Sequence, residues 1–182
     1  ELDAIGALYP FETWPTNRGV RPYDPFNPAA REIYWKYLKH LYGMNIDAWW
    51  SDSTEPDHFE KPGDDDHLTA DGSWRSVKNA FPLMTSKGIY EKLRQQKGND
   101  KRAFMMTRSS SFGIQHYGTF SWSGDITSTW ETFKNQIPSG LNYILCGIPY
   151  WNTDIGGFFC WDYNNGPRDP FAQELQVRWM QW

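Results

Sequence analysis

Predicted helices and short apolar strands alternate along this chain, and that alternation limits the possible fold more than any other feature. Asn27-Pro28 and Asp169-Pro170 combine an N-cap residue with proline at the first helical position, which is typical of a helix start. Helices are predicted from residue 28 to Gly43, over 83–97, from the Ser128…Glu131 capping box onward, and from 169 toward Trp182. Strands are predicted at 46–52, 103–107, 120–122 and 148–153. Alternation of this kind predicts an α/β fold with a parallel sheet and helical crossovers.

Two segments lie outside this alternation. Residues 1–26 are interrupted by four prolines and are predicted to be loop-like. Residues 53–78 are polar and glycine-rich, and they are predicted to form an excursion after the first strand rather than a linker between domains. The 182 residues are enough for one domain with a substantial core.

The overall charge and hydropathy argue against two classes of partner. The net charge is −4 and the pI is about 5.5, which does not suggest a nucleic-acid partner. No apolar run approaches the ~20 residues of a membrane span. The sequence opens at Glu1 without a signal-peptide pattern, so we expect it to begin inside a longer protein. Cys146 and Cys160 fit free thiols or a bridge, and they leave the compartment open, with the periplasm or secretion as one expectation.

Charged side chains gather where the predicted strands end. Asp52, Arg108, Asp125 and Asp154 each come at or just beyond a strand's carboxyl end. In a parallel barrel these ends share one face, and that face carries the active site. The alternative is structural, because aspartate is also common after strands as a turn former or helix cap.

The aromatic content adds a second indication. The chain has 11 Trp, 10 Tyr and 11 Phe, and flat apolar rings suit sugar faces as well as cores and interfaces. Two carboxylates beside aromatic walls are the minimum for glycoside hydrolysis, in which one carboxyl protonates the departing oxygen and the other attacks the anomeric carbon. An arginine nearby favours the ionised form of a carboxylate and can hydrogen-bond sugar hydroxyls.

Three motifs, in order, resemble glycoside hydrolase family 31. The family pattern W-x-D-x-x-E appears at 50–55 as Trp50-Ser51-Asp52-Ser53-Thr54-Glu55. The acid/base segment is similar to Thr107-Arg108-Ser109 … Gln115-His116-Tyr117 … Trp122-Ser123-Gly124-Asp125, with His116 where arginine is usual. The following segment is similar to Gly147-Ile148-Pro149 … Asp154-Ile155-Gly156-Gly157-Phe158.

The resemblance implies a fold and a set of site residues. It implies that residues 1–182 are a partial catalytic domain, the middle and later strands of a (β/α)8 TIM barrel, since a whole barrel needs about 200–250 residues or more. Asp52 then matches the nucleophile and Asp125 the acid/base. The matching residues around the cleaved sugar are Trp50, Arg108, Trp122, Asp154 and Phe158. The early strands, one of which supplies another substrate-binding aspartate, and a terminal Arg-x-His are expected outside this sequence.

The resemblance also implies an activity. We expect a retaining, exo-acting α-glycoside hydrolase without a cofactor, whose partners are an oligosaccharide substrate and the remainder of its own barrel. The segment from Asp47 to Asp57 looks most like α-xylosidases acting on xyloglucan fragments, and α-glucosidase is the alternative. A carbohydrate-binding module would also be rich in Trp, but it would not need Asp52 and Asp125 at strand ends, and a purely structural piece of a larger assembly is a third alternative. The fragment alone is expected to be inactive.

Two further groups have simpler interpretations. Asp64-Asp65-Asp66-His67 could suggest a metal site, but a solvated acidic loop is the preferred interpretation, and no metal is expected. Glu55 could pass for a catalytic acid. Since the resemblance assigns that role to Asp125, Glu55 is interpreted as a hydrogen-bonding or helix-start residue.

Overall fold

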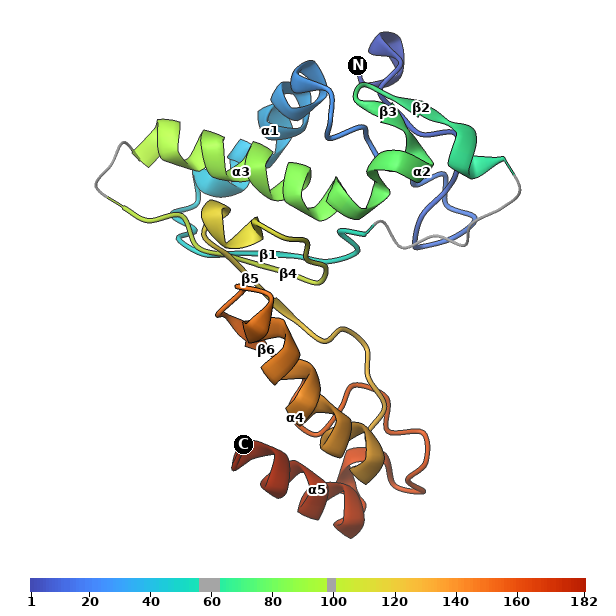
Figure 1. Ribbon diagram of the computed structural model, residues 1–182, viewed down its shortest axis with the longest axis vertical. Helices are drawn as coiled ribbons and strands as arrows, with labels where there is room; N and C mark the ends of the chain where they lie inside the picture. Colours follow the sequence, from blue (N-terminus) through green and yellow to red (C-terminus); the bar gives the residue numbers. More distant parts are fainter. Residues whose placement is uncertain (56–62, 98–100) are drawn as a thin grey trace. The chain divides into compact units, whose positions relative to one another are not determined.

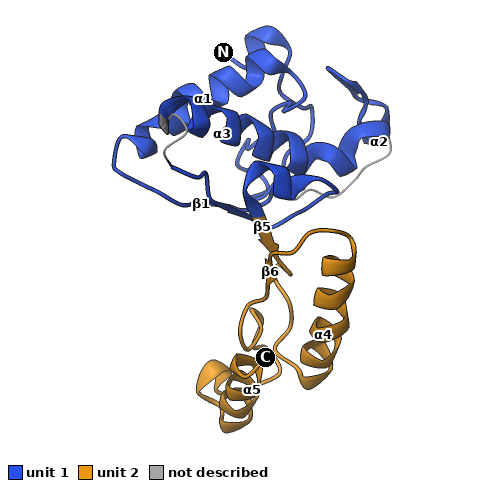
Figure 2. Ribbon diagram, turned by 60° about the vertical axis from the view of Figure 1, so that its left-hand side comes forward, with its two compact units in different colours: residues 1–119 blue, residues 120–182 orange. Residues whose placement is uncertain are grey.

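The computed structural model describes residues 1–55, 63–97 and 101–182, and the chain divides into two compact units. Unit 1 comprises Glu1–Thr119 and unit 2 comprises Phe120–Trp182 (Figure 2). The helices of unit 1 are α1 (Pro28–Tyr42), the short α2 (Trp74–Val77) and α3 (Phe81–Lys97). Its strands include β1 (Trp49–Ser51), a hairpin of β2 (Leu68–Thr69) and β3 (Gly72–Ser73), and β4 (Met105–Thr107). The remaining elements are β5 (Thr119–Trp122), in which the division falls, α4 (Trp130–Leu145), β6 (Trp151–Asn152) and α5 (Pro170–Met180).

The strands at the predicted positions pair in parallel, as the alternation predicts, whereas β2 and β3 form an antiparallel hairpin. In unit 1, β1 pairs with β4 with Trp49 opposite Met105 and Ser51 opposite Thr107. In unit 2, Ser121 and Trp122 of β5 lie opposite Trp151 and Asn152 of β6. Three of the four predicted strands, β1, β4 and β6, are shorter than predicted, because backbone pairing ends before the apolar sequence runs do, whereas β5 begins one residue earlier than predicted.

In unit 1, α1 and α3 cover the same face of the β1–β4 pair (Figure 1). The core between these layers contains fully or nearly fully buried side chains, namely Trp35, Trp49, Ile89, Leu93, Ala103 and Met105. The α1 helix begins as predicted, since the Asn27 side chain accepts the N–H groups of Ala29 and Ala30. These contacts fix the carboxyl end of β1, from which the candidate site projects.

The first 26 residues are mostly loop, as predicted, but part of this segment is buried. Tyr9 is fully buried and Phe11 nearly so, and both pack against Trp74 of α2. The carboxylate of Asp24 accepts the N–H of Phe26 at 3.0 Å and the N–H of Ala70 at 2.8 Å, which ties the β2–β3 hairpin to the start of α1. The segment predicted as an excursion therefore has its own small structure anchored by a buried carboxylate.

Unit 2 packs α4 and α5 together through aromatic side chains. Trp179 is buried and stacks on Phe133, with ring centroids 4.9 Å apart. The predicted cap of α4 is wrong by one residue. Thr129, not Ser128, caps the helix by accepting the N–H of Thr132, because the Ser128 hydroxyl instead donates to the carbonyl of Gly156. Asp169 caps α5 as predicted.

Two other features bear on the sequence predictions. Cys146 and Cys160 are both free thiols, and Cys146 is exposed. Within the described ranges, none of the helices combines the length and the apolar character that crossing a membrane requires.

Candidate active site

The register of the β1–β4 pair brings Asp52 and Arg108 together. Each is the first residue after its strand, and the Arg108 N–H continues the ladder by donating to the carbonyl of Ser51 at 3.1 Å. Arg108 Nη1 lies 3.3 Å from Asp52 Oδ1. That oxygen also accepts the N–H of Ser53 at 2.8 Å, and the chain turns directly afterwards, since Ser53 has a left-handed backbone (φ +50°). The two side chains predicted to share the strand-end face therefore do so.

Exposure differs sharply across this ion pair. The side chain of Arg108 is 13% exposed, whereas that of Asp52 is 42% exposed. The cation is thus held in the protein while the carboxylate remains open to a reactant. Trp50, which points away from the core residue Trp49, is also exposed.

A cavity of about 350 Å³ lies beside Asp52 within unit 1. Its walls combine aromatic side chains, such as Trp49, Trp50 and Tyr34, with Arg21 and several hydroxyl groups, so the Asp52 carboxylate faces a mixed aromatic and polar surface. Small-molecule sites commonly combine apolar walls with a few polar groups, in volumes of about 300–1,000 Å³.

The loop that carries Asp52 is held to the loop after β4 by hydroxyl groups. Thr54 Oγ1 and Thr107 Oγ1 share a short hydrogen bond, and the N–H of Ser109 donates to Thr54 Oγ1 at 3.1 Å. Thr54 and Thr107 are both buried. These contacts lock the position of the segment that follows the candidate nucleophile.

From the sequence, Glu55 is interpreted as a hydrogen-bonding or helix-start residue, and Ser109 is assigned no role. The Glu55 carboxylate accepts hydrogen bonds from Arg108 and from the Ser109 hydroxyl, which confirms a hydrogen-bonding role. The helix-start alternative falls on residues 56–62 and lies outside the described residues. The hydroxyl-rich runs that follow β1 and β4 at the same register were the available signal for Ser109.

In unit 2, the loop after β5 carries Asp125, which is exposed. Gly124 takes a left-handed conformation (φ +73°), and the Ser123 hydroxyl donates to Thr153 Oγ1 at 3.0 Å. The segment after Trp122 therefore lies beside the one before Asp154.

The loop after β6 is joined directly to the loop of Asp125. The N–H groups of Phe158 and Phe159 donate to the carbonyl of Ile126 at 2.8 and 3.0 Å, and the N–H of Ser128 donates to the carbonyl of Phe159 at 2.8 Å. Gly157 approaches so closely that an added Cβ would lie 2.6 Å from Ser128 Cα. Phe158 remains 55% exposed, whereas Trp122 is buried. Unit 2 thus groups Trp122, Asp125, Asp154 and Phe158 on neighbouring loops.

The seven predicted site residues form two groups. Trp50, Asp52 and Arg108 belong to unit 1, and the other four belong to unit 2. The facing of the Asp52 and Asp125 carboxyls at about 5–5.5 Å, which a retaining mechanism requires, stays a prediction.

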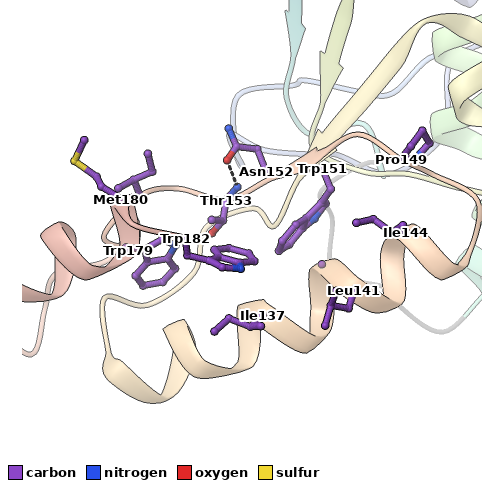
Figure 3. A pocket seen from close by; sticks show the side chains of 12 residues that line it. Ile137, Leu141, Ile144, Pro149, Trp151, Asn152, Thr153, Trp179, Met180 and Trp182 are labelled. Atoms are coloured by element: carbon purple, nitrogen blue, oxygen red, sulfur yellow. Dashed lines mark hydrogen bonds between the residues drawn. The ribbon is translucent and has the colours of Figure 1, made fainter.

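Two other places are poor candidates for catalysis. A cavity of about 310 Å³ in unit 2 lies between α4, Trp151 of β6 and the end of α5 (Figure 3), but none of its lining residues is charged. In the acidic cluster at 64–67, Asp65 pairs with Lys78 and Arg75, and the His67 ring packs against Tyr9. Over residues 1–55, 63–97 and 101–182, no three His, Cys, Asp or Glu side chains form a group that could hold a metal ion.

Comparison with known proteins agrees with this arrangement. Residues 4–182 match the family model described as the glycosyl hydrolases family 31 TIM-barrel domain. An α-xylosidase of Saccharolobus solfataricus is 36% identical over 204 residues, which cover 100% of this chain and 27% of that protein. Human neutral α-glucosidase AB is 30% identical over 187 residues, which cover 97% of this chain and 18% of that protein.

Solved structures give the same result. A family 31 α-xylosidase from Xanthomonas citri has a TM-score of 0.86 and 33% identity, over 99% of this chain and 21% of that one. A soil-metagenome α-xylosidase complexed with xylose has a TM-score of 0.85 and 30% identity, over 100% of this chain and 27% of that one. The chain spans about a quarter of the length of these relatives. Its strand pairing, its strand-end residues and these matches show that the chain belongs to glycosyl hydrolase family 31 and is part of a TIM-barrel domain.

Proposed function

We propose that the full-length protein containing this chain is a retaining, exo-acting α-glycoside hydrolase that releases α-linked xylose from xyloglucan-type oligosaccharides. Asp52 is the nucleophile and Asp125 the acid/base. The observation that carries this proposal is the open Asp52 carboxylate at the carboxyl end of β1, held by the buried guanidinium of Arg108. An ionised, accessible carboxylate supported by a fixed cation is what nucleophilic attack on an anomeric carbon requires.

The reaction proceeds in two balanced steps. The Asp52 carboxylate attacks the anomeric carbon while the Asp125 carboxyl gives its proton to the departing oxygen, which leaves a glycosyl ester on Asp52. Asp125, now a carboxylate, takes a proton from water as that water attacks the same carbon and releases Asp52. No cofactor takes part in either step. Trp50, Arg108, Trp122, Asp154 and Phe158 surround the sugar being cleaved.

The xylosidase assignment and its alternative come from different relatives. An α-xylosidase is 36% identical to this chain, and α-xylosidases are also among its structural matches. Proteins named α-glucosidases are 30–33% identical over most of the chain, and they support α-glucosidase as the second candidate.

The decisive experiment uses the full-length enzyme with aryl α-xyloside and the matching α-glucoside. We expect a higher kcat/KM for the xyloside, and a clear preference for the glucoside would support the second candidate. Asp52→Ala should abolish turnover. Asp125→Ala should leave the first step of an activated substrate largely intact, slow the second step, and recover its rate with added azide. An Asp52→Ala enzyme with near-normal activity would exclude the assignment.

A further inference from the structure

Glu55, three residues after Asp52, accepts two hydrogen bonds from Arg108 at one carboxylate oxygen and one from Ser109 at the other. Arg108 Nε donates to Glu55 Oε1 at 2.6 Å, and Arg108 Nη2 donates to the same oxygen. The hydroxyl of Ser109 donates to Glu55 Oε2. The carboxylate is therefore oriented by two partners that both belong to the loop after β4.

These contacts divide the guanidinium into two sides. The Nε–Nη2 edge faces Glu55, and Nη2 also lies 3.3 Å from the hydroxyl of Ser53. The remaining nitrogen, Nη1, faces Asp52 Oδ1 at 3.3 Å. Because a guanidinium is planar and rigid, holding one edge fixes the direction of Nη1.

Among the side chains of Arg108, Asp52 and Glu55, that of Arg108 is the most buried, and both carboxylates contact it. The side chain of Arg108 is 13% exposed, against 42% for Asp52 and 36% for Glu55. A guanidinium prefers two parallel hydrogen bonds to one carboxylate, and a single nearby carboxylate would be drawn into that pairing. If Asp52 were the only acidic partner, both of its oxygens would be committed to Arg108 and less available for attack.

We infer that Glu55 is a positioning residue: it occupies the Nε–Nη2 edge of Arg108, so that Arg108 supports Asp52 through Nη1 and leaves that carboxylate accessible for reaction. The inference rests on the proposed role of Asp52 as the nucleophile. Glu55 acts through Arg108 and does not touch the substrate.

The test is a double-mutant cycle in the full-length enzyme, with an activated aryl α-xyloside as substrate. Glu55→Gln keeps the shape of the side chain and removes its charge. We expect it to lower kcat/KM by about 10²-fold, mainly through kcat, since misplacing a reacting group by about 1 Å has an effect of that size. In an Arg108→Met background, Glu55→Gln should lower kcat/KM by less than about 3-fold, because the guanidinium through which Glu55 acts has been removed.

Two further variants keep the test decisive. Ser109→Ala removes one contact to Glu55 and leaves its charge, and it should give a smaller loss that also disappears in the Arg108→Met background. Asp65→Asn is the matched control, because Asp65 pairs with Lys78 and Arg75 away from the site. It should lower Tm about as much as Glu55→Gln while kcat/KM stays within about 3-fold.

The outcomes separate the two proposals. A Glu55→Gln enzyme with wild-type kcat/KM, or losses from Glu55→Gln and Arg108→Met that simply multiply, would overturn the positioning role. An active Asp52→Ala enzyme would instead overturn the proposed function, whatever the result at position 55.

Discussion

Two glycines of unit 2 offer a matched pair for testing how the loop of Asp125 is held. Gly157 and Gly147 have similar left-handed backbones, with φ of +84° and +79°. A Cβ at Gly157 would lie 2.6 Å from Ser128 Cα and 2.7 Å from its nitrogen, whereas a Cβ at Gly147 would meet nothing within 4 Å. Alanine therefore causes the same backbone strain at both positions but a collision only at Gly157.

The size of the difference follows from the structure. Left-handed strain costs about 1–2 kcal/mol at either position. Carbon atoms pack at about 3.5–4.0 Å, so Gly157→Ala requires a shift of about 1 Å between two backbone segments. That shift strains the hydrogen bonds from Ser128 and Phe158 across the same loops, each worth about 1 kcal/mol. We expect Gly157→Ala to cost about 3–5 kcal/mol and Gly147→Ala about 1–2 kcal/mol.

Activity should separate the two variants further. Displacing the Asp125 loop by about 1 Å should lower kcat/KM by about 10²-fold in Gly157→Ala, while Gly147→Ala should stay close to wild type. The measurements are thermal unfolding and initial rates on an aryl α-glycoside with the full-length enzyme. Equal rates and equal melting temperatures for the two variants would refute the argument that this close backbone contact positions Asp125.

Three other predictions concern side chains of unit 1, one of them with a control variant in unit 2. Burial raises the pKa values of Tyr9 and Tyr23 above the ordinary tyrosine value. Above about pH 10, each tyrosine therefore stays protonated in the folded state but loses its proton in the unfolded chain. The free energy of unfolding should fall by about 1.4 kcal/mol per pH unit for each tyrosine, and its fall with pH should be shallower in Tyr23→Phe. Leu93→Ala should lower the free energy of unfolding by about 2–5 kcal/mol in denaturant titrations, because Leu93 is fully buried. The control Leu145→Ala should change it by less than about 0.5 kcal/mol, because Leu145 is 83% exposed. Asp24→Asn should cost about 1–3 kcal/mol in the same titrations, because it removes a buried charge that accepts two backbone N–H groups.

Much of the fold was predictable because its signals are local. The caps at Asn27 and Asp169 depend on a side chain and the next two or three residues, and both were correct. The lengths of β1, β4 and β6 were overestimated because strand length depends on how far the partner strand remains in register. The hairpin at 68–73 was missed, although Thr69 donates to the carbonyl of Gly72 and accepts the N–H of Asp71 within its turn; its contact with Asp24, 46 residues away, could not be predicted from local sequence. Ser128 and Thr129 are equally good caps by composition, and the contact of Ser128 with Gly156 decided between them.

The candidate site was predictable to a similar extent. The proximity of Asp52 and Arg108 follows from the rule that parallel strands end together. The direction of Glu55 did not follow from any pattern. It depends on the left-handed turn at Ser53 and on the hydroxyl of Ser109, which only the folded chain brings together.

The hydroxyl contacts beneath the Asp52 loop have a consequence for laboratory evolution of substrate preference. Thr54, Thr107 and Ser109 hold the loop through hydrogen bonds in which the side chain at the exposed position 50 takes no part. Mutant libraries at position 50 should therefore retain many folded members and sample new sugars. Libraries at 54 or 107 should lose most of their diversity to misfolding before any selection for activity begins.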